Sequence, residues 1–456
     1  MASFLFRQKV PFIAHDFSSS ETFWSHFSEA HIALSLQEKK TLFLELQKAP
    51  QQIHFQSEYL QGIQSADAIF VGQNWKNYPQ NHPVLSQRKT DGVPFFTLME
   101  LYFACSPAPI CGISGTNGKT TTTNWLRTIL QSHVPCLQGG NDLFQPQCLH
   151  QLNTLQSNHY LVLEISNRQL EWLEASPYLG ILTNIAEDHL EEHGSFEAYS
   201  EVKKKLVRHA KIAILNQEDP QLVALSTTLS ADTYLFGFSP CRGLYVQEGT
   251  LYQNLGNKPV ALLSVSEMKL NGKHHLLNGM AAALSALLLG VPTEKIIAGL
   301  KEFTGVRNRT QKIASVSGIT YINDMACTSP HAALAALDYI SEPIHLICGG
   351  DHKGADFSQI NAKLLEKVRT IVLLPGTLGE VLQHPKIYPV TDLASAVQLA
   401  TQFAQSGETV LLSPMACGFF SRFVRGKNSF SQLVKSLWRE TPSSPRNYSH
   451  SIGTTS

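Results

Sequence analysis

The segment from Ile113 to Thr120, ISGTNGKT, constrains the fold of this chain more than any other part of the sequence. It follows an apolar run and precedes a helix-like stretch, Thr121 to Gln131. Two glycines let the main chain approach phosphate oxygens, the dipole of the next helix attracts an anion, Lys119 neutralises charge and Thr120 can ligate magnesium. A turn without a ligand does not call for a lysine followed by four threonines. The segment therefore predicts a phosphate-binding loop, although isoleucine stands at position 113, where the strict P-loop pattern has glycine.

Apolar runs alternate with helical patterns along most of the chain, which is typical of a parallel sheet covered by helices. The expected strands are Ile110–Ile113, Tyr160–Ile165, Gly180–Ile185 and Ile212–Leu215 in one group, and Ile319–Ile322, Ile344–Cys348, Thr370–Leu374 and Thr409–Leu412 in another. Between the groups, Tyr234 to Ser266 has the pattern of short strands joined by turns and precedes an alanine-rich helix, Leu277 to Leu289. We therefore predict an α/β fold with a small antiparallel addition in the middle.

The length of 456 residues exceeds what one hydrophobic core usually organises, so we expect several domains. The predicted divisions are an N-terminal domain at 1–106, a central domain at 107–305, a C-terminal domain at 306–440 and a disordered tail at 441–456. Within the first domain we expect a helix from Ser57 to Ser65 and a strand from Ala68 to Gly72.

The composition argues against several classes of protein. Lysine plus arginine equals aspartate plus glutamate at 36 each, with no long run of one sign, which disfavours a nucleic-acid surface. Apolar runs fall far short of the roughly 20 residues that a membrane-spanning helix needs, and the N-terminus lacks the features of a signal peptide. The 8 cysteines are scattered without zinc spacing. We predict a monomeric cytoplasmic protein with free thiols and no membrane span.

The run GTNGKTTT, which starts at Gly115, resembles the ATP-binding loop of the Mur ligases and of the related folylpolyglutamate synthetases. The resemblance extends over most of the chain. It implies three α/β domains: a short N-terminal domain for a UDP-linked substrate, a central P-loop-like ATPase domain and a C-terminal Rossmann-like domain. The expected contacts to ATP in the loop are Gly115, Thr116, Asn117, Gly118, Lys119, Thr120 and Thr121.

Two further segments resemble those that carry the metal chemistry of the family. LVLEISNRQL, at 161–170, is similar to VLELSSFQLE, and Glu164 matches the magnesium-binding glutamate. The segment 183–204 resembles TN-x-x-x-DHL-D-x-H-GS-x-x-x-Y-x-x-x-K, so that His189 matches a second metal ligand and Lys203 matches a lysine carried as a carbamate. Alone, a glutamate that caps a strand or a lysine on a solvated helix face would be the simpler reading. The order of these residues after a phosphate loop favours a magnesium site made of Thr120, Glu164, His189 and Lys203.

Later segments resemble nucleotide-contacting motifs of the same family. GKHHLLN, which ends at Asn278, is similar to GxHNxxN and implies that Asn278 lies near adenine. Arg309 matches an arginine that reaches the ATP phosphates, and Asp324 belongs to the ND-x-x-x-T motif of the third domain. The run GGDHKGADF, at 349–357, is close to the GGxxKxxDF of the branch of the family that adds D-glutamate.

The sequence also departs from that branch. Ala326 stands where the family has a lysine beside the incoming amino acid, and the segment after Ser413 is altered and shortened. Arg422 or Arg425 would replace the lost charge. The glycine-rich GLGxTG turn that holds UDP is not seen ahead of Asp16, so we expect a shortened N-terminal domain. The expected substrate contacts are Asp16, Asn141, Lys353, Arg422 and Arg425.

The resemblance implies an ATP-dependent amide-bond ligase that adds D-glutamate to UDP-N-acetylmuramoyl-L-alanine in peptidoglycan synthesis. ATP and Mg²⁺ are the expected cofactors, and the substrate carboxylate is activated as an acyl phosphate. Lys119, Glu164, His189 and carbamylated Lys203 would stabilise charge on the transferring phosphoryl group. Two alternatives stay open: a sibling ligase that uses L-glutamate or another amino acid, and a non-catalytic homologue that binds nucleotide.

Overall fold

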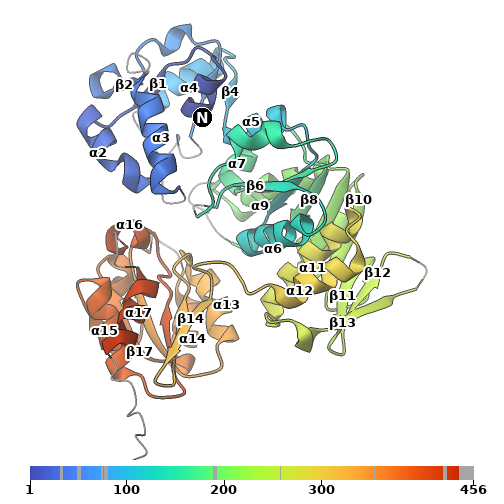
Figure 1. Ribbon diagram of the computed structural model, residues 1–456, viewed down its shortest axis with the longest axis vertical. Helices are drawn as coiled ribbons and strands as arrows, with labels where there is room; N and C mark the ends of the chain where they lie inside the picture. Colours follow the sequence, from blue (N-terminus) through green and yellow to red (C-terminus); the bar gives the residue numbers. More distant parts are fainter. Residues whose placement is uncertain are drawn as a thin grey trace, which may run out of the picture. The chain divides into compact units, whose positions relative to one another are not determined.

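The computed structural model describes residues 1–30, 34–48, 53–72, 75, 81–142, 144–187, 193–256, 258–352, 356–424 and 429–440 (Figure 1). The chain divides into two compact units, Met1–Thr304 and Gly305–Ser456. The finer division of the first unit into domains at 1–106 and 107–305 stays a prediction. The predicted disordered tail at 441–456 lies outside the described residues.

The first part of the first unit combines short helices with two small parallel sheets. Its elements are α1 (Ala2–Arg7), β1 (Ala14–Asp16), α2 (Ser20–Ala30), α3 (Leu36–Gln47), β2 (Ile53–Phe55), β3 (Ile69–Phe70), α4 (His82–Thr90), β4 (Phe95–Phe96) and α5 (Leu98–Cys105), with β1 paired to β2 and β3 to β4. The predicted helix from Ser57 to Ser65 is wrong. Leu60 and Gly62 have positive φ angles of 64° and 80°, which an α-helix cannot include, and only two short 3₁₀ turns form there.

The rest of the first unit is built around a nine-stranded sheet with the order β13-β12-β11-β10-β9-β8-β5-β7-β6. The strands are β5 (Ile110–Ser114), β6 (Cys136–Gly140), β7 (Tyr160–Glu164), β8 (Leu179–Leu182), β9 (Ile212–Asn216), β10 (Asp232–Gly237), β11 (Gly243–Gln247), β12 (Thr250–Asn254) and β13 (Val260–Ser264). Strands β5 to β11 pair in parallel, and β11, β12 and β13 pair antiparallel. The four strands predicted in this group, and the antiparallel addition, are confirmed.

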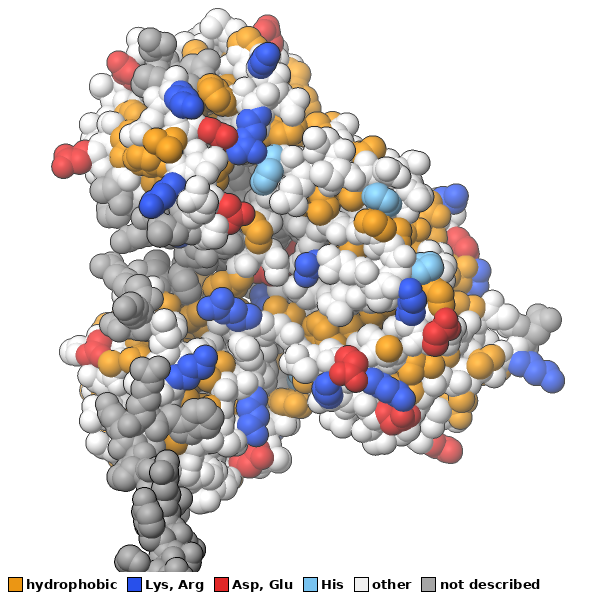
Figure 2. All heavy atoms as spheres, viewed as in Figure 1, with side chains coloured by type: hydrophobic (Ala, Val, Ile, Leu, Met, Phe, Trp, Pro, Cys, Tyr) orange, Lys and Arg blue, Asp and Glu red, His pale blue; other side chains and the backbone are white. Residues whose placement is uncertain are grey.

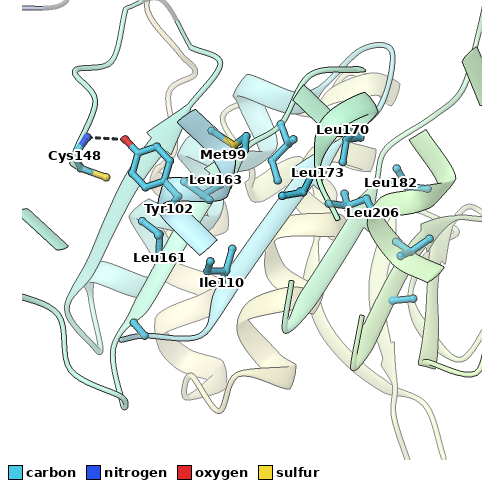
Figure 3. Close-up of a cluster of buried hydrophobic side chains, with 14 of the residues drawn as sticks. Met99, Tyr102, Ile110, Cys148, Leu161, Leu163, Leu170, Leu173, Leu182 and Leu206 are labelled. Atoms are coloured by element: carbon cyan, nitrogen blue, oxygen red, sulfur yellow. Dashed lines mark hydrogen bonds between the residues drawn. The ribbon is translucent and has the colours of Figure 1, made fainter. Parts of the chain in front are cut away.

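Helices cover this sheet on both faces. They are α6 (Lys119–Gln131), α7 (Asn167–Trp172), α9 (Phe196–Arg208), α10 (Pro220–Ser226), α11 (Lys273–Leu288) and α12 (Thr293–Glu302). Helices α6, α11 and α12 pack together, and α6 lies against β5, β6 and β7. Helices α5, α7 and α9 contribute to a separate apolar cluster with the sheet strands (Figure 3).

Tyr102 shows how this apolar cluster accommodates a polar atom. Its ring is fully buried, and its hydroxyl accepts a hydrogen bond from the backbone N–H of Cys148 at 3.0 Å and donates one to Gln147 Oε1 at 2.9 Å (Figure 3). Burial raises the pKa of this phenol, so the hydroxyl stays protonated. Each fully buried leucine around it, such as Leu161 and Leu163, contributes about 1.5–3 kcal/mol to folding.

The first unit ends against the helix that follows the phosphate loop. Phe303 stacks on the buried indole of Trp125 in α6, with 4.4 Å between ring centres and 15° between ring planes. The indole Nε1 donates to the carbonyl of Gly299 at 3.0 Å. Gly279 of α11 lies so close to this indole that a Cβ atom there would be 2.9 Å from the ring.

The second unit contains a six-stranded sheet with the order β14-β15-β19-β16-β17-β18. Its strands are β14 (Gln311–Val316), β15 (Ile319–Asn323), β16 (Ile344–Gly349), β17 (Val368–Leu374), β18 (Ile387–Pro389) and β19 (Thr409–Leu412), and its helices are α13 (Pro330–Tyr339), α14 (Ser358–Lys367), α15 (Leu393–Phe403), α16 (Phe419–Phe423) and α17 (Phe430–Glu440). All pairs except β14 with β15 are parallel. The four strands predicted for this region are confirmed. Strand β19 lies between β15 and β16, so the carboxyl ends of these three strands meet at one edge.

Charged side chains of both signs are interspersed on the face of the molecule seen in Figure 2. This distribution agrees with the equal numbers of acidic and basic residues, 36 of each. Among the described residues, no helix combines the length and the apolar character needed to cross a membrane.

Candidate active site

The predicted phosphate loop connects β5 to α6, and glycine is required at two of its positions. Gly115 and Gly118 have φ angles of 144° and 85°, which disfavour residues with a side chain. A Cβ atom on Gly115 would collide with Thr183 Oγ1, and one on Gly118 would collide with Asn278 Oδ1. Glycine at these two positions therefore lets the loop pack closely against Thr183 and Asn278. The helix begins at Lys119, two residues earlier than predicted.

The segment after β8 holds this loop in place. Thr116 Oγ1 donates to the carbonyl of Ala186 at 3.1 Å and accepts from the N–H of the same residue at 3.0 Å. The N–H of Asn117 donates to Asn184 Oδ1 at 3.0 Å, and Thr183 Oγ1 donates to the carbonyl of Asn117 at 2.5 Å. These bonds fix the loop before any ligand binds, which reduces the entropy lost on binding. Hydrogen bonds of Thr116 and Asn117 thus hold the loop against the segment after β8.

Two lysines donate to the same carbonyl oxygen of the loop. Lys119 Nζ lies 2.9 Å from the oxygen of Gly115 and 2.7 Å from that of Thr116. Lys203 Nζ, which comes from α9, also lies 2.9 Å from the Gly115 oxygen. Lys203 is only 1% exposed, and its amino group lies 4.6 Å from the centre of the Tyr199 ring. The fold therefore brings together two of the predicted catalytic residues, which are far apart in sequence.

Glu164 ends β7, next to the strand that leads into the loop, with its backbone opposite Ile113. It is 2% exposed, and its Oε1 accepts a hydrogen bond from Asn141 Nδ2 at 3.2 Å. Its other oxygen, Oε2, has no hydrogen-bond partner among the described residues. A buried, unsatisfied carboxylate oxygen is costly, and coordination of a hard cation would satisfy it. This residue fits the predicted magnesium site.

The structure describes Thr120 but not His189, the two other predicted metal ligands apart from Lys203. Thr120 is buried in the first turn of α6, and Thr121 follows it. His189 lies outside the described residues. Within the described ranges, no group of three or more His, Cys, Asp or Glu side chains could hold a metal. The predicted set combines the carboxylate of Glu164, the hydroxyl of Thr120 and a modified Lys203 with the imidazole of His189, and it stays a prediction.

Helix α11 contributes Asn278 to the wall of the loop. The Asn278 amide packs against Gly118, and its Oδ1 accepts from Thr122 Oγ1 at 3.3 Å. Its predicted contact with adenine stays a prediction. His275, one turn earlier, stands where the family has asparagine. Burial, aided by neighbouring His274, lowers the pKa of His275 to about 3, so its ring is neutral at physiological pH.

In the second unit, Asp324 is buried at the carboxyl end of β15. It accepts hydrogen bonds from the N–H of Thr310 and from Ser413 Oγ, both at 3.0 Å. Burial raises the pKa of Asp324 to about 6, and these two hydrogen bonds and the positive charge of Arg309 oppose that shift. The fold thus brings together Arg309 and Asp324, two of the predicted nucleotide contacts.

The predicted substrate contacts fall in several places. Asp16 caps a turn, accepting from the N–H of Ser18 at 2.8 Å. Asn141 contacts Glu164, as described above. Arg422 pairs with Asp351, and one of its nitrogens lies 3.2 Å from Asp351 Oδ1. Lys353 and Arg425 lie outside the described residues.

Sequence reasoning missed one polar residue that holds the loop and one buried polar residue in the edge strand β6. Asn184 holds the phosphate loop, and its presence in the TN segment was the available signal. Gln138, in β6, is 7% exposed, and neither polar atom of its side chain has a hydrogen-bond partner among the described residues. Its position in the otherwise apolar and glycine-rich strand CLQGG was the signal that could have revealed it.

A tight glycine loop between a strand and a helix, a lysine at the helix start and a buried carboxylate beside them define a P-loop-like nucleotide-binding protein. Family models agree with this class: residues 113–286 match the Mur ligase middle domain, and residues 308–415 match the Mur ligase, glutamate ligase domain. The chain belongs to the Mur ligase family of ATP-dependent ligases.

Known relatives support this assignment. A protein of Symbiobacterium thermophilum named UDP-N-acetylmuramoylalanine--D-glutamate ligase is 30% identical over 83% of this chain and 86% of its own length. A protein of the same name from Caldanaerobacter subterraneus is 31% identical over 90% of this chain and 92% of its own length. The crystal structure of MurF ligase from Thermotoga maritima in complex with ADP has a TM-score of 0.58 and 18% identity, and the match covers 81% of this chain and 99% of that chain. This last likeness shows the fold.

Proposed function

We propose that this chain is an ATP-dependent ligase that adds D-glutamate to UDP-N-acetylmuramoyl-L-alanine in peptidoglycan synthesis. The observation that carries the proposal is the meeting of Lys119 and Lys203 at one loop carbonyl, beside the strand that ends in the half-satisfied Glu164. The unsatisfied carboxylate oxygen of Glu164 supports a metal ion beside the nucleotide phosphates. The names of the two relatives and the retained GGDHKGADF run support glutamate as the added amino acid.

In this mechanism the loop between β5 and α6 binds the ATP phosphates through its main chain, and Lys119 neutralises the charge that develops during transfer. The carboxylate of the UDP-linked substrate takes the terminal phosphoryl group and becomes an acyl phosphate. The amine of glutamate then attacks the acyl carbon, and phosphate leaves. Thr120, Glu164, His189 and carbamylated Lys203 would hold Mg²⁺, and the metal ion would neutralise further charge on the phosphates.

The surroundings of Lys203 support the predicted carbamate. Its amino nitrogen, when neutral, can attack carbon dioxide and lose a proton, which leaves an anion in place of a cation. As an ammonium, Lys203 would sit close to the like charge of Lys119 in a buried site, whereas a carbamate would attract both Lys119 and magnesium. Tyr199 and the Gly115 carbonyl line the position of this group.

Asn278, Arg309 and Asp324 complete the proposed nucleotide contacts, and Asp16, Asn141, Lys353, Arg422 and Arg425 complete the proposed substrate contacts. The proposal includes a monomer in the cytoplasm, where ATP is available. L-glutamate is the second candidate for the added amino acid, because Ala326 replaces the lysine that the family places beside it.

An activity assay tests the function directly. Purified protein with ATP, Mg²⁺ and UDP-N-acetylmuramoyl-L-alanine should release ADP and phosphate only when glutamate is added, and we expect the D enantiomer to be preferred. The product mass should increase by one glutamate residue. Turnover with L-glutamate alone would favour the second candidate. Absence of ADP release with either enantiomer would contradict the proposed reaction.

Replacing Glu164 with glutamine tests the metal site. The amide keeps the size and the hydrogen bond with Asn141 but lacks the anionic oxygen, so the Mg²⁺ concentration for half-maximal activity should rise at least about tenfold. Glu174→Gln is the matched control, because Glu174 is an exposed glutamate beyond the end of α7. Equal magnesium dependence in both variants would remove Glu164 from the metal site.

A further inference from the structure

The guanidinium of Arg422 is held by an internal carboxylate. Both terminal nitrogens of Arg422 face the two oxygens of Asp351, with 3.2 Å between Nη1 and Oδ1 and a shorter contact between Nη2 and Oδ2. This is the two-pronged arrangement in which arginine binds a carboxylate most specifically. The backbone N–H of Thr377 also donates to Asp351 Oδ1, at 3.3 Å.

This pair lies at the edge of the sheet where ligands bind in open α/β folds. Asp351 follows β16, and Arg422 lies beyond β19 in α16, while β19 separates β15 from β16 in the sheet. Such a break in strand order opens a crevice at the carboxyl ends of the strands. The N–H of Asp351 donates to the carbonyl of Cys417 at 3.0 Å, and the N–H of Cys417 donates back to Asp351 at 3.0 Å. The segment that carries Asp351 and the segment that leads into α16 are therefore hydrogen-bonded to each other at this edge.

The pair is well suited to exchange one carboxylate for another. The side chains of Arg422 and Asp351 are 46% and 30% exposed to solvent. Solvent therefore screens the ion pair, which contributes little to folding. Any incoming carboxylate would meet the same two donors. After displacement, Asp351 would still accept from Thr377.

The proposed substrate supplies a reason for such an exchange. Glutamate brings two carboxylates, and an unpaired buried anion is costly. Position 326, three residues beyond the end of β15, is an alanine and provides no cation. An arginine that already holds a carboxylate is oriented for a ligand of the same chemistry and is blocked from weaker anions.

We propose, on the basis of the function proposed above, that Arg422 binds a carboxylate of the amino-acid substrate and that Asp351 is its resting partner, which the substrate displaces. Arg422 then determines specificity for an acidic amino acid. Asp351 is a positioning residue: it orients Arg422 and, by competing with the substrate carboxylate, lowers the affinity for glutamate. The two residues should therefore act in opposite directions on the binding of glutamate.

The test measures KM for the glutamate enantiomer that the wild type ligates, together with KM for ATP. Asp351→Asn should lower KM for glutamate about threefold to fivefold, because the substrate no longer competes with an internal anion. Arg422→Ala should raise it at least about tenfold, and Arg422→Lys should raise it less, since lysine keeps the charge without the fork. KM for ATP should stay unchanged.

Lys363→Ala is the matched control, because Lys363 forms an exposed ion pair with Asp338 away from this edge, at 2.8 Å. Thermal unfolding of each variant checks that the unit still folds. A rise of KM for glutamate in both Asp351→Asn and Arg422→Ala would make the pair a structural brace and overturn the exchange. Unchanged KM in both, with an active wild type, would overturn the exchange while the proposed function stands. A wild type that ligates neither enantiomer would overturn the proposed function, and the exchange with it.

Discussion

Replacing Lys119 with alanine should abolish ATP turnover, with a loss of at least about a thousandfold in kcat. The lysine starts α6 directly after Gly118, and its amino group donates hydrogen bonds to two carbonyl groups of the loop. It would exchange these bonds for contacts with phosphate. The loss should appear in kcat more than in folding, because the side chain is only partly buried.

Arg127→Ala is the control for this experiment, because Arg127 is a cation on the same helix, two turns beyond the loop. Both variants should unfold cooperatively at nearly the temperature of the wild type. If Lys119→Ala turned over ATP at the wild-type rate, the loop would not be the phosphate site.

Replacing Lys203 with alanine should lower kcat at least about a hundredfold, and acetate should restore part of it. The substitution opens a buried space beside Tyr199 and the Gly115 carbonyl, in which a small carboxylate can take the place of the carbamate. Rescue by an anion separates this role from a purely structural one, because acetate cannot replace a cation.

Lys204→Ala is the neighbouring control, since Lys204 lies on the same helix but pairs with Glu201 at the surface, at 3.0 Å. It should leave kcat unchanged. Removal of bicarbonate should slow the wild type and leave Lys203→Ala unaffected. A wild-type rate in Lys203→Ala, with no response to bicarbonate, would make Lys203 an ordinary buried lysine.

The sheets could be predicted from the sequence because their strands are buried on both faces. Runs such as Ile110–Ile113 and Ile212–Leu215 are continuous and apolar, and helices on both sides of a parallel sheet produce this pattern. The helix expected at 57–65 failed for a local reason, because the backbone at Leu60 and Gly62 turns left-handed. Periodicity does not reveal a positive φ at leucine.

The candidate site was predictable in its parts but not in its contacts. Lys119 stands in a local motif, whereas Lys203 reaches the loop from 88 positions further along the chain, and only the order of strands β5, β8 and β9 brings it there. Asp351 belongs to the GGDHKGADF segment, but its pairing with Arg422 depends on β16 and β19 being neighbours in the sheet. His189, Lys353 and Arg425 lie outside the described residues, and the roles of the other site residues also stay predictions.

The stacking of Phe303 on Trp125 also decides where the polypeptide can be divided for expression of its first half alone. A chain that stopped at residue 302 would lack the ring that covers the indole, and loss of a buried phenylalanine costs about 3–5 kcal/mol. That loss would fall on the helix that begins at the phosphate loop, so a short fragment would appear unable to bind nucleotide for a reason unrelated to chemistry. Because the second unit starts at Gly305, a cut after Thr304 keeps the stacked pair whole.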